Sequence, residues 1–235
     1  MSATPVPAPA GKFFTSMDMG DILEGKTTEI TPGVNYDIDG YGLMFGHHNR
    51  CDQGRFVYTR IKGDFDISVQ MESVRNDKNA FAEAGLMVRK DLTPNGLMLG
   101  QSVANNEYHS EGDQYIFMYR LKENGCSDDN PVSEIFGKGT YGNKNYAHSG
   151  WGYYPDDVGK RPRPFPKVWL RIKREGNRYV GFFRENDLPW TKLGETRIKL
   201  GKEPYVGMFI TANHHGGNAN IRAQAKFRNL QGFWK

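Results

Sequence analysis

The chain has 235 residues, of which 25% are charged, and its formal net charge is only +4. This small excess gives no indication of a polyanionic partner such as nucleic acid. No apolar run approaches the about 20 residues that a membrane-spanning helix needs, and no secretory signal is visible, so no membrane partner is expected. The 28 glycines and 13% aromatic residues are typical of many strands joined by tight turns, and the length suits one large all-β domain or two small ones.

The N-terminal part of the chain predicts little regular structure. Residues 1–12 are rich in proline and alanine and are predicted to be a disordered tail. The segment from Phe13 to Gly25 predicts an edge strand followed by a loop. Asp37 to Gly40 has the composition of a turn, and its two carboxylates could help to hold a structural calcium ion. No other cofactor or metal is expected.

The middle of the chain contains the clearest strand patterns. Phe56 to Arg60 predicts a strand, and Phe65 to Glu72 alternates apolar and polar residues, as a half-buried strand does. In Phe81 to Arg89, the residues Ala84, Leu86 and Val88 would share one face, with Gly85, Met87 and Arg89 on the other. Arg89 then either ends the strand in solvent or belongs to a working surface on the sheet.

The C-terminal half predicts further strands around one long interruption. Gln114 to Arg120 alternates, whereas residues 122–166 form an aromatic insert without strand rhythm. A hairpin is predicted from Val168 to Arg184, with its turn at Glu175 to Asn177. The last predicted strands are Tyr205 to Thr211 and Ala223 to Leu230. Because no helix of normal length is evident, residues 13–235 are predicted to form a single antiparallel β-sandwich or jelly roll.

Four runs of the sequence resemble one family. Arg55 to Gln70, Ala82 to Asp91, Trp169 to Phe183 and Pro204 to His214 are similar, in this order, to the DUF1349-type concanavalin A-like lectin/glucanase family. The resemblance implies a two-sheet jelly roll that carries ligands on the concave face of one sheet. It also implies carbohydrate binding, because many such domains are carbohydrate-binding appendages. The insert departs from the family pattern, and His47 to Arg50 is not carried over from it.

Cationic and phenolic residues in the sequence match the chemistry of a lyase acting on a uronic-acid polysaccharide. An Arg, Asn or Gln would neutralise the substrate carboxylate, so that the proton on the adjacent carbon becomes removable. A His or Tyr would take that proton, and another would donate one to the leaving oxygen. The candidate catalytic residues are His48, Arg50, Arg89, Arg120, Tyr146 and His148, and the candidate substrate-binding residues are His47, Gln114, Trp151 and Tyr153. Arg89 or Arg50 would bind the carboxylate.

Two alternatives stay open. A non-catalytic carbohydrate-binding module would use Trp151 and Tyr153 to stack on sugar rings, although these aromatics could instead pack the insert onto the sandwich. A glycoside hydrolase would need two carboxylates about 5–9.5 Å apart, and Glu111 and Asp113 on one strand face would lie roughly 6.6 Å apart. The three-carboxylate strand motif of the fold's glucanases is broken at Ile116.

Charge and cysteine patterns bear on the ligand and the compartment. Residues 160–184 carry many cations and only one acidic residue, which favours an acidic ligand or marks a solvated sheet face. Cys51 and Cys126 could pair in an oxidising compartment. We therefore expect a secreted or periplasmic monomer whose partner is an acidic polysaccharide.

Overall fold

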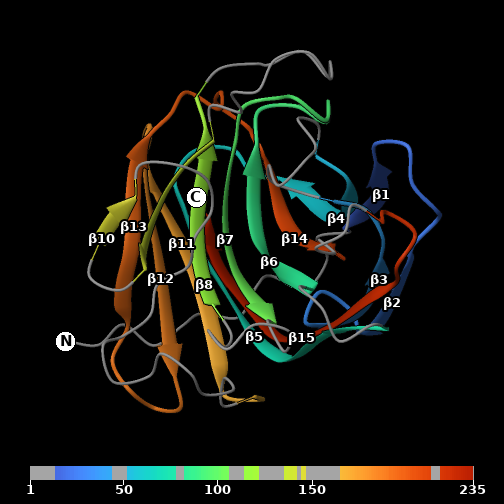
Figure 1. Ribbon diagram of the computed structural model, residues 1–235. Helices are drawn as coiled ribbons and strands as arrows, with labels where there is room; N and C mark the ends of the chain where they lie inside the picture. Colours follow the sequence, from blue (N-terminus) through green and yellow to red (C-terminus); the bar gives the residue numbers. More distant parts are fainter. Residues whose placement is uncertain are drawn as a thin grey trace.

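The computed structural model describes residues 14–43, 52–77, 82–105, 114–121, 135–141, 144–146, 165–212 and 218–234. These residues form fifteen strands and no helix (Figure 1). Within them, therefore, no helix is long and apolar enough to cross a membrane. The strands make two antiparallel sheets that pack face to face, so the predicted all-β antiparallel sandwich is confirmed.

The first sheet has eight strands and includes the green strands of Figure 1. Its order is β1 (Thr15–Met19), β4 (Gly54–Arg60), β14 (Tyr205–Thr211), β6 (Ala82–Arg89), β7 (Met98–Asn105), β8 (Gln114–Arg120), β9 (Ile135–Tyr141) and β10 (Lys144–Tyr146). The edge strand predicted near the start of the chain is β1. Strands β9 and β10 come from the predicted insert, where the sequence shows no strand rhythm.

The second sheet has seven strands and includes the strands labelled β11, β12 and β13 in Figure 1. Its order is β13 (Thr191–Arg197), β12 (Arg178–Glu185), β11 (Val168–Glu175), β5 (Phe65–Asn76), β15 (Ala223–Trp234), β3 (Asn35–Gly40) and β2 (Lys26–Thr31). Strands β11 and β12 form the predicted hairpin, with Gly176 in the left-handed region at φ +59°. Glycine adopts this conformation without steric cost, which explains the tight turn.

The turn predicted at Asp37 to Gly40 is wrong, because these residues lie in strand β3. Ile38 is buried in the core, and the two carboxylates between the buried positions lie on the other face of the strand. Asp37 pairs with Arg228 at 2.8 Å, and Asp39 accepts a hydrogen bond from Gln224 at 3.3 Å. The turn-like composition thus reflects a strand whose exposed side carries acidic groups paired across the sheet.

The core lies between the two sheets and follows the period-two pattern of the sequence. Ala84, Leu86 and Val88 of β6 point inward, as predicted, and each is fully buried. They meet the apolar side of β5, on which Phe65, Ile67, Val69 and Met71 are also buried, as predicted. All eight residues of β6 are buried, so Arg89 does not end the strand in solvent.

Two facing glycines allow the sheets to approach closely at one point of the core. Gly181 of β12 and Gly194 of β13 are register partners, and a Cβ atom at either position would overlap the ring of Phe117 on β8. The side chain of Gln101 also lies against Gly181. Gln101 is fully buried, and neither polar atom of its amide has a hydrogen-bond partner among the described residues. Gln101 is thus a buried amide in the core between the sheets, without a partner among the described residues.

Candidate functional site

The outer face of the eight-stranded sheet, which points away from the core, is apolar and covered. Phe56, Met87, Met118 and Phe209 stand on this face and form a second hydrophobic cluster, in which each of them is at most 1% exposed. Leu92, from the loop between β6 and β7, packs against the cluster. This face is therefore not an open trough along its whole length.

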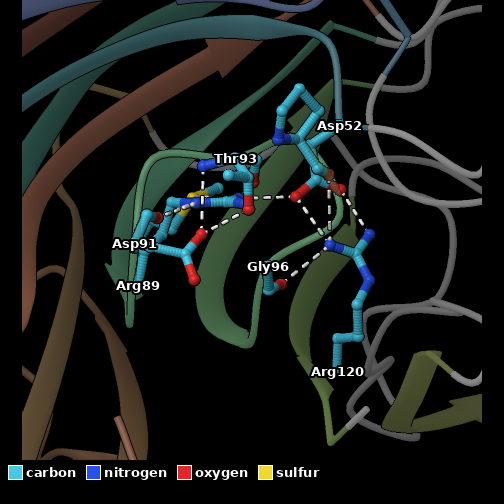
Figure 2. A network of polar contacts seen from close by, with 8 residues as sticks. Asp52, Arg89, Asp91, Thr93, Gly96 and Arg120 are labelled. Carbon is cyan, nitrogen blue, oxygen red and sulfur yellow. Dashed lines mark hydrogen bonds and ion pairs between the residues drawn. The ribbon is translucent and has the colours of Figure 1, made fainter. Parts of the chain in front are cut away.

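A buried ionic network lies on this face (Figure 2). Asp52, just before β4, accepts hydrogen bonds from the guanidinium groups of Arg89 and Arg120. The three ion-pair distances are 2.5 Å from Arg89 Nη1 to Asp52 Oδ2, 2.9 Å from Arg120 Nη1 to Oδ2 and 2.5 Å from Arg120 Nη2 to Oδ1. The side chains are 0%, 0% and 1% exposed for Asp52, Arg89 and Arg120, so all three groups are removed from water.

The loop between β6 and β7 supplies the remaining acceptors of the two guanidinium groups. Arg89 donates to the carbonyl oxygens of Asp91 and Thr93, and Arg120 donates to those of Pro94 and Gly96. The loop holds this shape because the Asp91 carboxylate accepts from the backbone N–H and the hydroxyl of Thr93. The Pro94 carbonyl also accepts from the backbone N–H of Asp52 at 2.8 Å. The network thus fastens the loop to the sheet face.

The charges of the network do not cancel, since two cations share one carboxylate. Burial alone would raise the pKa of Asp52, but the two guanidinium groups outweigh it and hold the pKa below the usual range. Asp52 is therefore an anion at neutral pH. The four carbonyl dipoles offset part of the excess positive charge. Removing Asp52 would leave two buried cations without a counter-ion, which is strongly destabilising.

Arg89 and Arg120 are the two predicted catalytic residues that the structure brings together. Their donors are used by Asp52 and by backbone carbonyls, except that Arg120 Nε has no partner among the described residues. As the side chains stand, they hold the loop rather than facing solvent. Their role on a substrate carboxylate stays a prediction.

The other predicted site residues are placed only in part. Gln114 lies in β8 and Tyr146 in β10. The predictions that fall outside the described residues are those on His47, His48, Arg50, His148, Trp151, Tyr153, Glu111, Asp113, Cys51, Cys126 and the tail 1–12. Within the described ranges, no three His, Cys, Asp or Glu side chains are grouped as metal ligands.

Two tyrosines and an arginine that were not among the predicted site residues form a cluster on this face, which we call the tyrosine rim: Tyr58, Tyr205 and Arg60. Tyr58 and Tyr205 are partly exposed, and their rings meet edge to face with centroids 5.4 Å apart. The Arg60 guanidinium lies over the Tyr205 ring at 5.3 Å. Tyr58 also stacks on buried Phe56 at 5.1 Å, which fixes its orientation. The alternation Phe56, Tyr58, Arg60 in a predicted strand was the available signal.

The tyrosine rim adjoins the ionic network. Tyr205 is the register partner of Arg60 on one side and of Arg89 on the other. Partners on adjacent strands point to the same face, so the side chains of Tyr205 and Arg89 leave neighbouring strands on this face. Burial raises the pKa of Tyr58, with a smaller contribution from Tyr205, so Tyr58 stays protonated at neutral pH and can donate a hydrogen bond.

Two packed antiparallel sheets with these connections define a jelly-roll sandwich, and solved structures share it. A functionally unknown protein from Saccharomyces cerevisiae has a TM-score of 0.57 at 11% identity, covering 94% of this chain and 96% of that one. The GH43 BlXynB protein from Bacillus licheniformis has a TM-score of 0.50 at 12% identity, covering 89% of this chain. The matched region spans 34% of the length of the GH43 protein.

A legume lectin-like domain from Entamoeba histolytica has a TM-score of 0.47 at 10% identity, covering 93% of this chain and 97% of that one. No protein-family model matches the sequence, and no curated protein matches it. At these identities the likeness to the first two structures establishes a common fold. Membership of the DUF1349-type family stays a prediction.

Proposed function

We propose that this protein binds a polysaccharide on the outer face of the eight-stranded sheet, at the tyrosine rim, and that it works outside the cytoplasm. The observation that carries the proposal is the pair of partly exposed phenol rings beside Arg60, next to the buried apolar cluster of this face. Among the residues of this face whose burial the structure describes, no other two aromatic rings are partly exposed.

The chemistry of the rim suits a sugar. The C–H face of a sugar ring is apolar and packs on an aromatic ring, while the hydroxyl groups need hydrogen-bond partners. Tyr58 and Tyr205 provide rings and phenolic hydroxyls, and Arg60 provides further donors. The rim needs little reorganisation to bind, because Phe56 holds Tyr58 and the sheet holds both strands.

Binding by the full chain to a panel of soluble polysaccharides tests the proposal. The panel contains polygalacturonate, alginate, methyl-esterified pectin and a neutral glucan, and affinity is measured by calorimetry. Tyr58→Ala and Tyr205→Ala are each expected to weaken binding about tenfold, since an aromatic contact of this kind contributes on the order of 1.4 kcal/mol.

Leu188→Ala is the matched control, because Leu188 is 60% exposed and belongs to the other sheet's connections. It is expected to bind like the wild type. Tyr205→Phe keeps the ring and should retain most of the affinity. Absence of binding across the whole panel, or equal affinity of the alanine variants and the wild type, would exclude the rim as a sugar site.

A lyase acting on a uronic-acid polysaccharide is the second candidate, favoured by the exposed Arg60 guanidinium over the ring of partly exposed Tyr205. A guanidinium beside a phenol is the pair that neutralises a carboxylate and transfers a proton. Incubation with polygalacturonate and alginate, followed by ultraviolet absorbance of the unsaturated product, is the test. Binding without any such product would reject the lyase and leave the binding module. The hydrolase alternative would instead release reducing ends without unsaturation.

A further inference from the structure

The outer face of the seven-stranded sheet carries a row of aromatic rings and arginines, which we call the indole–arginine row: Trp169, Arg171, Phe182, Arg184 and Trp190. Trp169 on β11 and Arg184 on β12 are register partners, and Trp190 directly precedes β13. The Arg184 Cζ atom lies 4.7 Å from the ring centroid of Trp169 and 4.8 Å from that of Trp190. Both distances are within the range of cation–π attraction, so two indoles hold one guanidinium group.

The second arginine of the row differs from Arg184 in its charge balance. Arg171 lies over Phe182 at 5.3 Å and near Trp190 at 5.4 Å, and it is also paired through two nitrogens with the carboxylate of Asp66. Its positive charge is thus neutralised inside the protein. Neighbouring cations are paired in the same way: Lys173 and Arg178 contact Glu175, and Arg178 and Lys192 contact Glu195.

Arg184 has no carboxylate partner among the residues that the structure describes. Its Nε atom is buried and has no hydrogen-bond acceptor there, although the side chain as a whole is partly exposed. A guanidinium that is stacked on ring faces keeps its N–H donors in its own plane, where a planar carboxylate can accept two of them. The row therefore holds a preorganised guanidinium group that has no anionic partner in the part of the chain that the structure describes.

We propose that the indole–arginine row is a second binding site, and that it takes a carboxylate group of an acidic polysaccharide on Arg184. Trp169 and Trp190 would flank the sugar ring that bears this carboxylate. The site lies on the opposite outer face of the sandwich from the tyrosine rim, so neither site depends on the other.

An acidic sugar fits the row better than a single-stranded nucleic acid does. Bases bind to proteins by stacking on open aromatic faces. Here each indole already has the Arg184 guanidinium over its ring, and Trp190 also has Arg171 nearby. The group that remains available is the cationic edge, which recognises a charge rather than a base.

The test measures binding of the full chain to short oligogalacturonides by calorimetry, with their methyl esters as the uncharged counterpart. Arg184→Met keeps the apolar stem between the indoles and removes the charge, and it is expected to weaken oligogalacturonide binding at least tenfold. Arg197→Met is the matched control, because it removes the same charge from exposed Arg197 on the adjacent strand β13, and less than a twofold effect is expected. The affinity of the methyl esters for the wild type should be no higher than the affinity of the charged oligogalacturonides for Arg184→Met.

Arg184→Lys separates charge from geometry, because it keeps the charge and loses the planar fork; affinity between those of the wild type and Arg184→Met is expected. Equal effects of Arg184→Met and Arg197→Met, or equal binding of acids and methyl esters, would overturn the proposal. Tighter binding of a single-stranded oligonucleotide that is lost in Arg184→Met would replace it with a nucleic-acid site. Loss of binding in Tyr205→Ala but not in Arg184→Met would overturn this proposal and leave the tyrosine rim intact.

Discussion

Replacing Asp52 with asparagine tests the account of the buried network most directly. Asp52→Asn keeps the size of the side chain but leaves Arg89 and Arg120 without a counter-ion at sites that are 0% and 1% exposed. Breaking a buried ion pair in this way costs about 3–5 kcal/mol. For a chain of this length, that loss lowers the melting temperature by about 6–20 °C. Urea unfolding followed by tryptophan fluorescence gives the free energy of unfolding.

Asp77→Asn is the matched control for this experiment. Asp77 pairs with Arg222 at 3.3 Å, but the two side chains are 49% and 42% exposed, so the same chemical change should cost less than about 1 kcal/mol. Replacing all three members of the network with apolar residues should restore most of the stability that Asp52→Asn loses. If Asp52→Asn and Asp77→Asn unfold at the same urea concentration, the network does not carry the stability inferred from its burial.

The remaining predictions concern pH and the core. The pKa of Asp52 is lower in the folded than in the unfolded protein. The stabilisation that ionised Asp52 gives the folded state is therefore complete above about pH 4, and it is lost as the pH falls through the folded-state pKa. The difference in the free energy of unfolding between the wild type and Asp52→Asn should narrow below about pH 4. Gln101→Met should raise the free energy of unfolding by about 1–2 kcal/mol, because it removes a buried amide without partners, and a lower melting temperature would contradict this. Gly194→Ala should lower the free energy of unfolding by about 1–3 kcal/mol, because the new Cβ atom would overlap the ring of Phe117. Gly100→Ala should lower it less, because its Cβ atom would make ordinary contacts at 3.4 Å. Equal losses of stability in the two variants would disprove the packing argument.

The sequence by itself determined the fold class and the faces of the strands. Alternation in Phe65 to Glu72 and in Ala82 to Arg89 assigned the inward residues correctly, because the side-chain period of a strand is a local property. The hairpin around Gly176 was visible for the same reason. Local patterns failed at Asp37 to Gly40, where the acidic residues that suggested a turn instead contact Arg228 and Gln224 on the neighbouring strand β15.

Only the tertiary structure decided what the arginines do. Asp52 stands 37 residues before Arg89 and 68 before Arg120, and nothing local marks it as their partner. Likewise, the sequence left open whether the cations from Arg171 to Arg184 form a solvated sheet face or bind an acidic ligand. The structure places the guanidinium group of Arg184 over the rings of Trp169 and Trp190. An ion pair or a ring stack depends on which strands become neighbours, and this is set by the packing of the whole sandwich rather than by the adjacent residues.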